Sequence, residues 1–206
     1  MRNKTSPNHY PKARVDALTD GIFAVAMTLL VLDIRLPDGF VPTDSVQMVD
    51  ALFGLLPKFF PYALSFILLG LRWLWMTQLA TDGEYLHGAY ITWWLVYLLF
   101  ITCLPFSTML VGRYVAFAPA IWFYCINTAL IAFAAWRMIL LTPQTKNKEK
   151  MLEGQISMAV LLVSAIVCCL WSLWSPRMAL FGFLLNALAP QLTKWRTTKK
   201  STKGLS

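Results

Sequence analysis

Charged residues are scarce in this chain of 206 residues. Asp, Glu, Lys and Arg make up 14% of it, against about 25% in a typical soluble domain. Hydrophobic residues make up 58%, which is too many for a water-soluble fold to cover. The composition excludes a disordered chain and disfavours a soluble enzyme. We therefore expect most of the chain to lie in a lipid bilayer.

Residues that bind metals or catalyse reactions are also few. The chain has two histidines, His9 and His87, and four cysteines that all lie inside apolar runs: Cys103, Cys125, Cys168 and Cys169. They form no CxxC pair and no His/Cys cluster, so we expect buried thiols rather than disulfides or a metal site. The sequence predicts no cofactor, no bound metal and no enzymatic activity.

Six apolar runs are long enough, or nearly long enough, to cross a bilayer as helices, which takes about 20 residues. The last is the shortest. The first carries Asp20 and Asp33, unlike the plain apolar stretch of a signal peptide. The predicted spans are 17–36, 59–79 (with an alternative start near Leu52), 89–111, 117–141, 156–174 and 178–192.

The basic residues predict the orientation of these spans. Lys and Arg are concentrated before the first span, between the fourth and fifth, and after the sixth. Because such residues favour the cytoplasmic side, both termini are predicted to be cytoplasmic. The loop with Asp82 and Glu84 departs from this pattern. The net charge of +8 therefore follows the membrane topology, and we expect no nucleic-acid partner.

The predicted organisation has three parts: a basic cytoplasmic arm (1–16), a membrane domain (17–192) and a basic, disordered cytoplasmic tail (193–206). Aromatic residues near the ends of the spans are interpreted as interfacial anchors. They are Trp73, Trp75, Trp93, Trp94, Tyr114, Trp122, Trp171 and Trp174.

Carboxylates in the first turns distinguish the first span. Asp16 can stabilise the N-terminus of the helix. Asp20 lies a turn deeper, where an unpaired charge in lipid is costly, so it is expected to face protein and to pair with Arg14 or Arg72. A structural ion pair is favoured over an ion-binding site.

One stripe of the first span carries Val25, Leu29 and Leu32, with Thr28 at its border. Small residues nearby, such as Gly21 and Ala24, permit close contact between helices. Periodicity alone favours an ordinary packing seam.

Two motifs resemble the transmembrane protein 175 family of potassium channels. Arg14-x-x-x-Leu18-Thr19-Asp20 is similar to the family's Arg-x-x-x-Phe-Ser-Asp, and an apolar stretch with a threonine follows it in both. Leu104-Pro105-Phe106 looks like the Leu-Pro-Phe of the family's third helix. The length and the number of spans are also similar.

The resemblance implies an all-α membrane protein with six transmembrane helices per subunit. It implies a homotetramer in the cell membrane, whose first helices line a central pore. The pore would conduct potassium, with either strong or weak selectivity over other cations. Val25 would form the constriction, Thr28 a threonine layer near which K⁺ passes, and Leu29 and Leu32 the outer lining. A structural network would join Arg14, Thr19, Asp20 and Arg72.

The sequence departs from the family at two places. The family has Trp-x-x-His in the second helix, where this chain has Trp73 and Trp75 but no histidine. The family also has an Asn early in the third helix, where this chain has Trp93-Trp94. Arg72 is a candidate to replace the missing polar group.

Other functions remain open from the residues alone. A secondary transporter or proton-coupled carrier would need ionisable residues near the midplane, and the spans carry few. A membrane enzyme would need a polar cluster at one depth, which is lacking. A non-conducting scaffold would need neither.

Overall fold

The computed structural model describes residues 9–78, 85–142 and 148–183. Most of these residues are helical. The long helices are α1 (Lys12–Leu29), α3 (Leu56–Gln78), α4 (Gly88–Tyr114), α5 (Ala118–Leu141) and α6 (Lys148–Trp171). Shorter elements are the strands β1 (His9–Pro11) and β2 (Tyr85–His87), the 3₁₀ helix η1 (Leu30–Asp33), α2 (Ser45–Phe53) and α7 (Pro176–Ala179).

Five of the predicted spans are confirmed as helices long and apolar enough to cross a membrane: Lys12–Asp33, Leu56–Thr77, Gly88–Tyr114, Ala118–Leu141 and Gly154–Trp171. Of the sixth predicted span, 178–192, only the part up to residue 183 is described. It contains the end of α7 and a 3₁₀ turn over 180–183. The rest of that span, and the predicted tail 193–206, lie outside the described residues.

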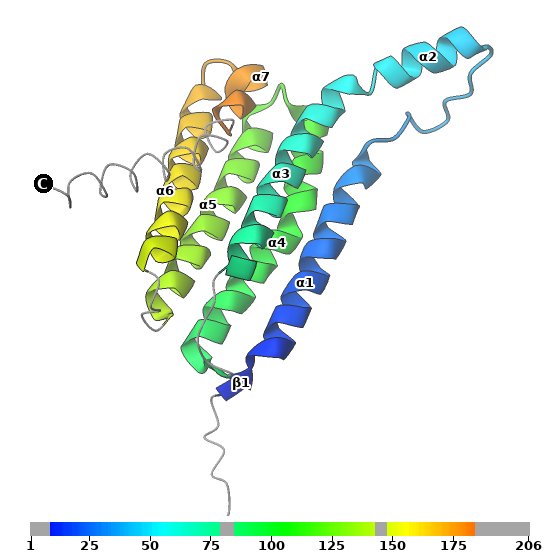
Figure 1. Cartoon of the computed structure of the whole chain (residues 1–206). Coiled ribbons are helices and arrows are strands. Elements are labelled where there is room, and N and C mark those ends of the chain that lie inside the picture. The colour runs from blue at the N-terminus through cyan, green and yellow to red at the C-terminus, as the bar shows by residue number, and fades with distance from the viewer. Residues whose placement is uncertain (1–8, 79–84, 143–147, 184–206) are drawn as a thin grey trace, which may run out of the picture.

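The long helices stand side by side, with α1 at one edge of the bundle and α6 at the other (Figure 1). Helix α4 packs against α1, α3 and α5, and α5 packs against α6. Ala132, Ala134 and Ala135 of α5 are fully buried. These small side chains let neighbouring helices approach closely, as is usual in membrane bundles.

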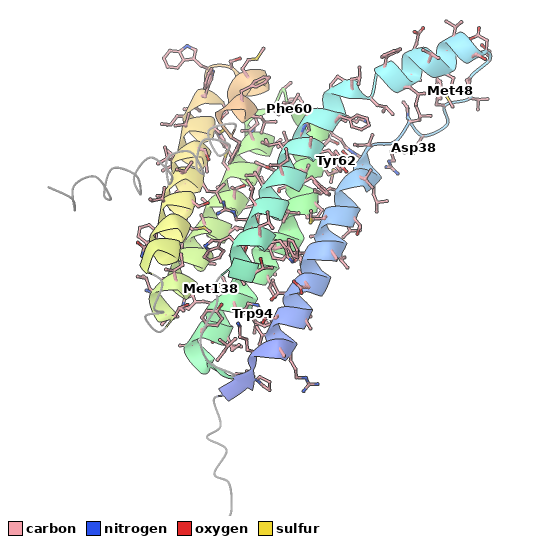
Figure 2. The ribbon with its side chains drawn as sticks, in the orientation of Figure 1. Asp38, Met48, Phe60, Tyr62, Trp94 and Met138 are labelled. Carbon is pink, nitrogen blue, oxygen red and sulfur yellow. The ribbon has the colours of Figure 1, made fainter. Side chains whose placement is uncertain are left out.

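Two features were not predicted. Helix α2 is separate from α3, and its N-cap Asp44 accepts a hydrogen bond from the backbone N of Gln47 at 2.8 Å. The segment with Asp38 and Met48 extends beyond the ends of the other helices (Figure 2). The second feature is a short antiparallel pair of β1 with β2, in a chain predicted to be all-α.

The strand pair fixes the start of α1. Tyr10 pairs with Leu86, whose side chain is buried in the same core as Val15 of α1. Helix α1 therefore begins at Lys12, earlier than the predicted Ala17, and its first turns are held against the segment that precedes α4. The residues of the predicted arm just before the membrane domain are thus ordered rather than a free extension.

Candidate pore-lining face

Helix α1 has two faces with different surroundings. Its core face carries Val15, Thr19, Phe23 and Ala26, all buried. The predicted stripe lies on another side of the helix, and its side chains are exposed: Val25 is 57% exposed, Leu29 44% and Leu32 65%. The stripe is therefore not a packing seam within this chain, which was the interpretation that periodicity alone favoured.

The exposed face of α1 also carries residues unsuited to lipid. At about 3.6 residues per turn, Gly21 and Thr28 fall on the same side as Val25, and all three are exposed. Small and hydroxyl-bearing residues on a membrane helix are typical of contacts with protein. The composition of this face indicates contact with protein or water rather than with acyl chains.

The hydroxyl of Thr28 is tied to its own helix. Its Oγ1 donates to the carbonyl oxygens of Ala24 and Val25, at 3.0 and 2.9 Å. Because the single hydroxyl proton is used in this way, the oxygen's lone pairs remain to accept from the exposed side. An oxygen with free lone pairs can coordinate an alkali cation.

Two residues of the predicted network, Thr19 and Asp20, bind tryptophans rather than arginines. Oδ1 of Asp20 accepts from Nε1 of Trp73 at 2.9 Å, and Oγ1 of Thr19 accepts from Nε1 of Trp94 at 2.8 Å. Trp94 lies near the base of the bundle, where α4 meets α1 (Figure 2). The expected ion pair of Asp20 with Arg14 or Arg72 is absent among the described side chains.

Arg72 contacts the far side of the bundle instead of α1. It is 4% exposed, and its guanidinium donates to Oγ of Ser157 at 2.7 Å and to Sδ of Met158 at 3.1 Å, both on α6. Its Nε has no partner among the described atoms. A buried guanidinium whose described partners are all neutral is unusual, because isolated buried charges are costly.

Sequence reasoning missed the polar role of two tryptophans. Trp73 and Trp94 were interpreted as interfacial anchors, yet each donates its indole N–H to the motif of α1. Trp94 is 4% exposed, so its ring is buried among the helices instead of facing outward. The signal available in the sequence was that Trp93-Trp94 occupies the place of the family's polar residue.

A salt bridge at the other end of α1 was also missed. Nε of Arg113, at the end of α4, lies 2.7 Å from Oδ1 of Asp33 in η1. A Cβ at Gly112 would lie 3.3 Å from the second carboxylate oxygen, so the glycine leaves room for this approach. The pair fastens the C-terminal end of the first span to α4.

A polar cavity of about 210 Å³ adjoins the motif at the N-terminal end of α1. Its walls come from α1 and α3, and they bring the two predicted carboxylates together with a lysine. The lining residues are Lys12, Asp16, Thr19, Asp20, Met76 and Thr77. Among the described residues, no group of His, Cys, Asp and Glu has the arrangement of a metal site.

Taken together, the fold and the site define a multi-pass α-helical membrane protein. Residues 14–105 match the family described as endosomal/lysosomal potassium channel TMEM175. This segment begins at Arg14 and ends at Pro105, so it contains the first motif in full and reaches into the second.

Known relatives agree with this match. The chain is 29% identical over 109 residues to a potassium channel of Chamaesiphon minutus, which covers 53% of each protein. It is 30% identical over 101 residues to a potassium channel of Streptomyces collinus, covering 49% of this chain and 48% of that one. A proton channel TMEM175 of Danio rerio is 41% identical over 69 residues, covering 30% of this chain and 13% of that protein. The chain thus spans about half the length of the bacterial relatives that it matches.

Solved structures share the fold over a greater length. A TMEM175 homologue from Chamaesiphon minutus, described as a lysosomal potassium-selective channel homologue, superposes with a TM-score of 0.75 at 22% identity. The superposition covers 88% of this chain and 97% of that one. A variant of the potassium channel MtTMEM175, solved in complex with a nanobody fusion protein, gives a TM-score of 0.54 at 15% identity, covering 96% and 98%.

These matches confirm the predicted resemblance to the TMEM175 family. The matched family and the bacterial relatives are described as potassium channels rather than as enzymes.

Proposed function

We propose that the chain forms a potassium channel whose pore is lined by the exposed face of α1. The observation that supports this most is the composition of that face: Gly21 and Thr28 lie exposed beside Val25, where a lipid-facing helix would present large apolar side chains. The potassium channels named among the relatives support the choice of ion.

In this proposal Val25 forms the constriction. A ring of valines is apolar, and an apolar ring that is narrow enough excludes water and thereby blocks ions. A small rotation or displacement of α1 would widen the ring. Thr28 lies about one turn beyond Val25, and its hydroxyl oxygen would replace part of the hydration shell of K⁺. Leu29 and Leu32 would line the pore further along.

A pore of this kind needs several copies of the chain, because each copy contributes one exposed face of α1. We propose a homotetramer in the cell membrane with both termini in the cytoplasm. No cofactor is required, and K⁺ is the permeant species, selected strongly or weakly over Na⁺. A single layer of hydroxyls offers few oxygens, which favours modest selectivity.

The test compares two valines in proteoliposomes. Val25 on α1 is 57% exposed and Val163 on α6 is 55% exposed, and both lie about two turns before the ends of their spans. We expect Val25→Trp to reduce K⁺ flux at least about tenfold, since a bulky ring fills the constriction, and Val163→Trp to leave flux unchanged. Repeating the assay with Na⁺ measures selectivity.

Other outcomes point to other functions. K⁺ flux that is equal in both variants and wild type would move the pathway away from α1 and contradict the proposal. Saturable flux that requires a co-transported ion or proton would indicate the carrier. No flux from folded wild-type protein, with or without a proton gradient, would favour the scaffold.

A further inference from the structure

We infer that Arg72 is a positioning residue that couples α6 to the pore-lining helix. The inference rests on the proposed function, because it assigns to Arg72 a part in setting the position of α1. Arg72 and Trp73 are consecutive residues of α3, and their side chains bind in opposite directions. Arg72 binds α6 through Ser157, and Trp73 binds α1 through Asp20.

The contact between α3 and α6 depends on long side chains. Besides the two hydrogen bonds of Arg72, the indole of Trp75 lies over Gly154: a Cβ built there would lie 2.5 Å from Nε1 of the ring. A side chain at position 154 would therefore displace Trp75. This end of α3 is attached to α6 by Arg72 and Trp75, while its other side reaches α1.

The hydrogen bonds of Arg72 leave the contact adjustable. Its described partners are a hydroxyl and a thioether, and neither carries a charge. The guanidinium Nε and the hydroxyl of Tyr97 on α4 are both buried and lack a partner among the described atoms. A guanidinium can form five hydrogen bonds and prefers carboxylates. The contact is therefore strong enough to align α3 and weak enough to be made and broken.

The geometry gives α3 the role of a link. A displacement of α6 near Ser157 moves Arg72, and the adjoining Trp73 transmits the movement to Asp20. Asp20 lies on the side of α1 between its core face and its exposed face. A pull at Asp20 therefore rotates Val25 and Thr28 about the helix axis, which is the motion that would widen or narrow the proposed constriction.

Substitutions at Ser157 test the link in both directions. Ser157→Ala removes the hydroxyl that Arg72 binds, and Ser157→Asp supplies a charged partner. We expect amide hydrogen exchange in α1 to become about threefold faster or more in Ser157→Ala, and slower by a similar factor in Ser157→Asp. K⁺ flux is expected to change in opposite directions in the two variants.

The controls separate coupling from loss of stability. A structural role alone would alter exchange in all helices, so α5 serves as the internal reference and is expected to change less than α1. Ser107→Ala removes a buried hydroxyl whose described bond is to the carbonyl of Leu104 in its own helix, on the helix α4 that itself packs against α1. It is expected to leave α1 exchange unchanged.

The two proposals fail separately. Changes of the same sign in both Ser157 variants, or equal changes in α1 and α5, overturn the coupling whether or not the protein conducts. Opposite changes in α1 exchange without any K⁺ flux in the wild type would support the coupling and contradict the channel.

Discussion

Helices α1 and α5 are similar in sequence character and different in their surroundings. Both are apolar enough to cross a membrane, yet 28% of the most apolar 18-residue stretch is buried within the chain in the first span and 56% in α5. Hydropathy thus identifies both as membrane helices without distinguishing their roles. The burial shows that α5 lies inside the bundle and that α1 has one face that its own chain does not cover.

The exposed faces of these helices differ in kind. On α5, Ile126, Phe133 and Leu140 follow a heptad spacing and are 58%, 49% and 56% exposed, so that face is large and apolar throughout. On α1, Leu18, Val25 and Leu32 follow the same spacing, but Gly21 and Thr28 lie beside them. The face of α5 is suited to lipid, whereas the face of α1 is suited to protein and water.

The largest expected effect is on stability, where a larger side chain should be tolerated on α1 but not on α5. Ala135 of α5 is fully buried, and Ala24 of α1 is exposed. Ala135→Leu is expected to overpack the bundle and to destabilise it by about 1–3 kcal/mol, lowering the melting temperature in detergent. Ala24→Leu is expected to leave the melting temperature within experimental error. Equal losses from both would show that Ala24 is packed against protein as tightly as Ala135 is.

A smaller effect compares two threonines. Thr28 on α1 and Thr128 on α5 each donate to a carbonyl of their own helix, but Thr28 is exposed and Thr128 is buried. We expect Thr28→Ala to lower the ratio of K⁺ to Na⁺ flux by about two- to tenfold, since it removes the hydroxyl oxygen proposed to replace part of the hydration shell of K⁺. Thr128→Ala is expected to leave the ratio unchanged. A change of ratio in Thr128→Ala alone would place the selective site elsewhere.

The smallest effect concerns the salt bridge at the end of the first span. Asp33→Asn removes the charge that pairs with Arg113, while keeping the side chain's size. Because exposed ion pairs contribute little and are screened by salt, we expect a slight fall in melting temperature at low ionic strength that disappears in concentrated salt. A large fall that salt does not affect would show that the carboxylate has a further role.

Much of the fold could be predicted from the sequence. Five spans follow from apolar length, which is a one-dimensional property and is dominated by the cost of exposing backbone in lipid. The paired strands β1 and β2 could not be predicted in the same way, because three-residue segments such as Tyr85–His87 carry almost no pattern. The separate helix α2 is short as well, and its apolar residues continue directly into those of α3.

The site was predicted less completely. The motif predicts that Thr19 and Asp20 bind other side chains, and both are hydrogen bonded. The predicted arginine partner of Asp20 was wrong, because the indole N–H of a tryptophan takes that place. Arg72 is a candidate partner of Asp20 from its charge and its depth in the span, but its guanidinium binds Ser157 and Met158 of α6 instead. The position of α6 relative to α3 cannot be predicted from a local sequence pattern.

Silver ions provide the most direct test of whether the exposed face of α1 faces an aqueous pathway. Ag⁺ is a monovalent cation that reacts with thiols, so it reports on positions reached by permeant ions. The comparison uses Val25→Cys and the equally exposed Val163→Cys in proteoliposomes, with wild type as the blank for its own four cysteines. The account predicts rapid, irreversible loss of K⁺ flux in Val25→Cys and wild-type behaviour in Val163→Cys. Persistent flux through silver-treated Val25→Cys would contradict it.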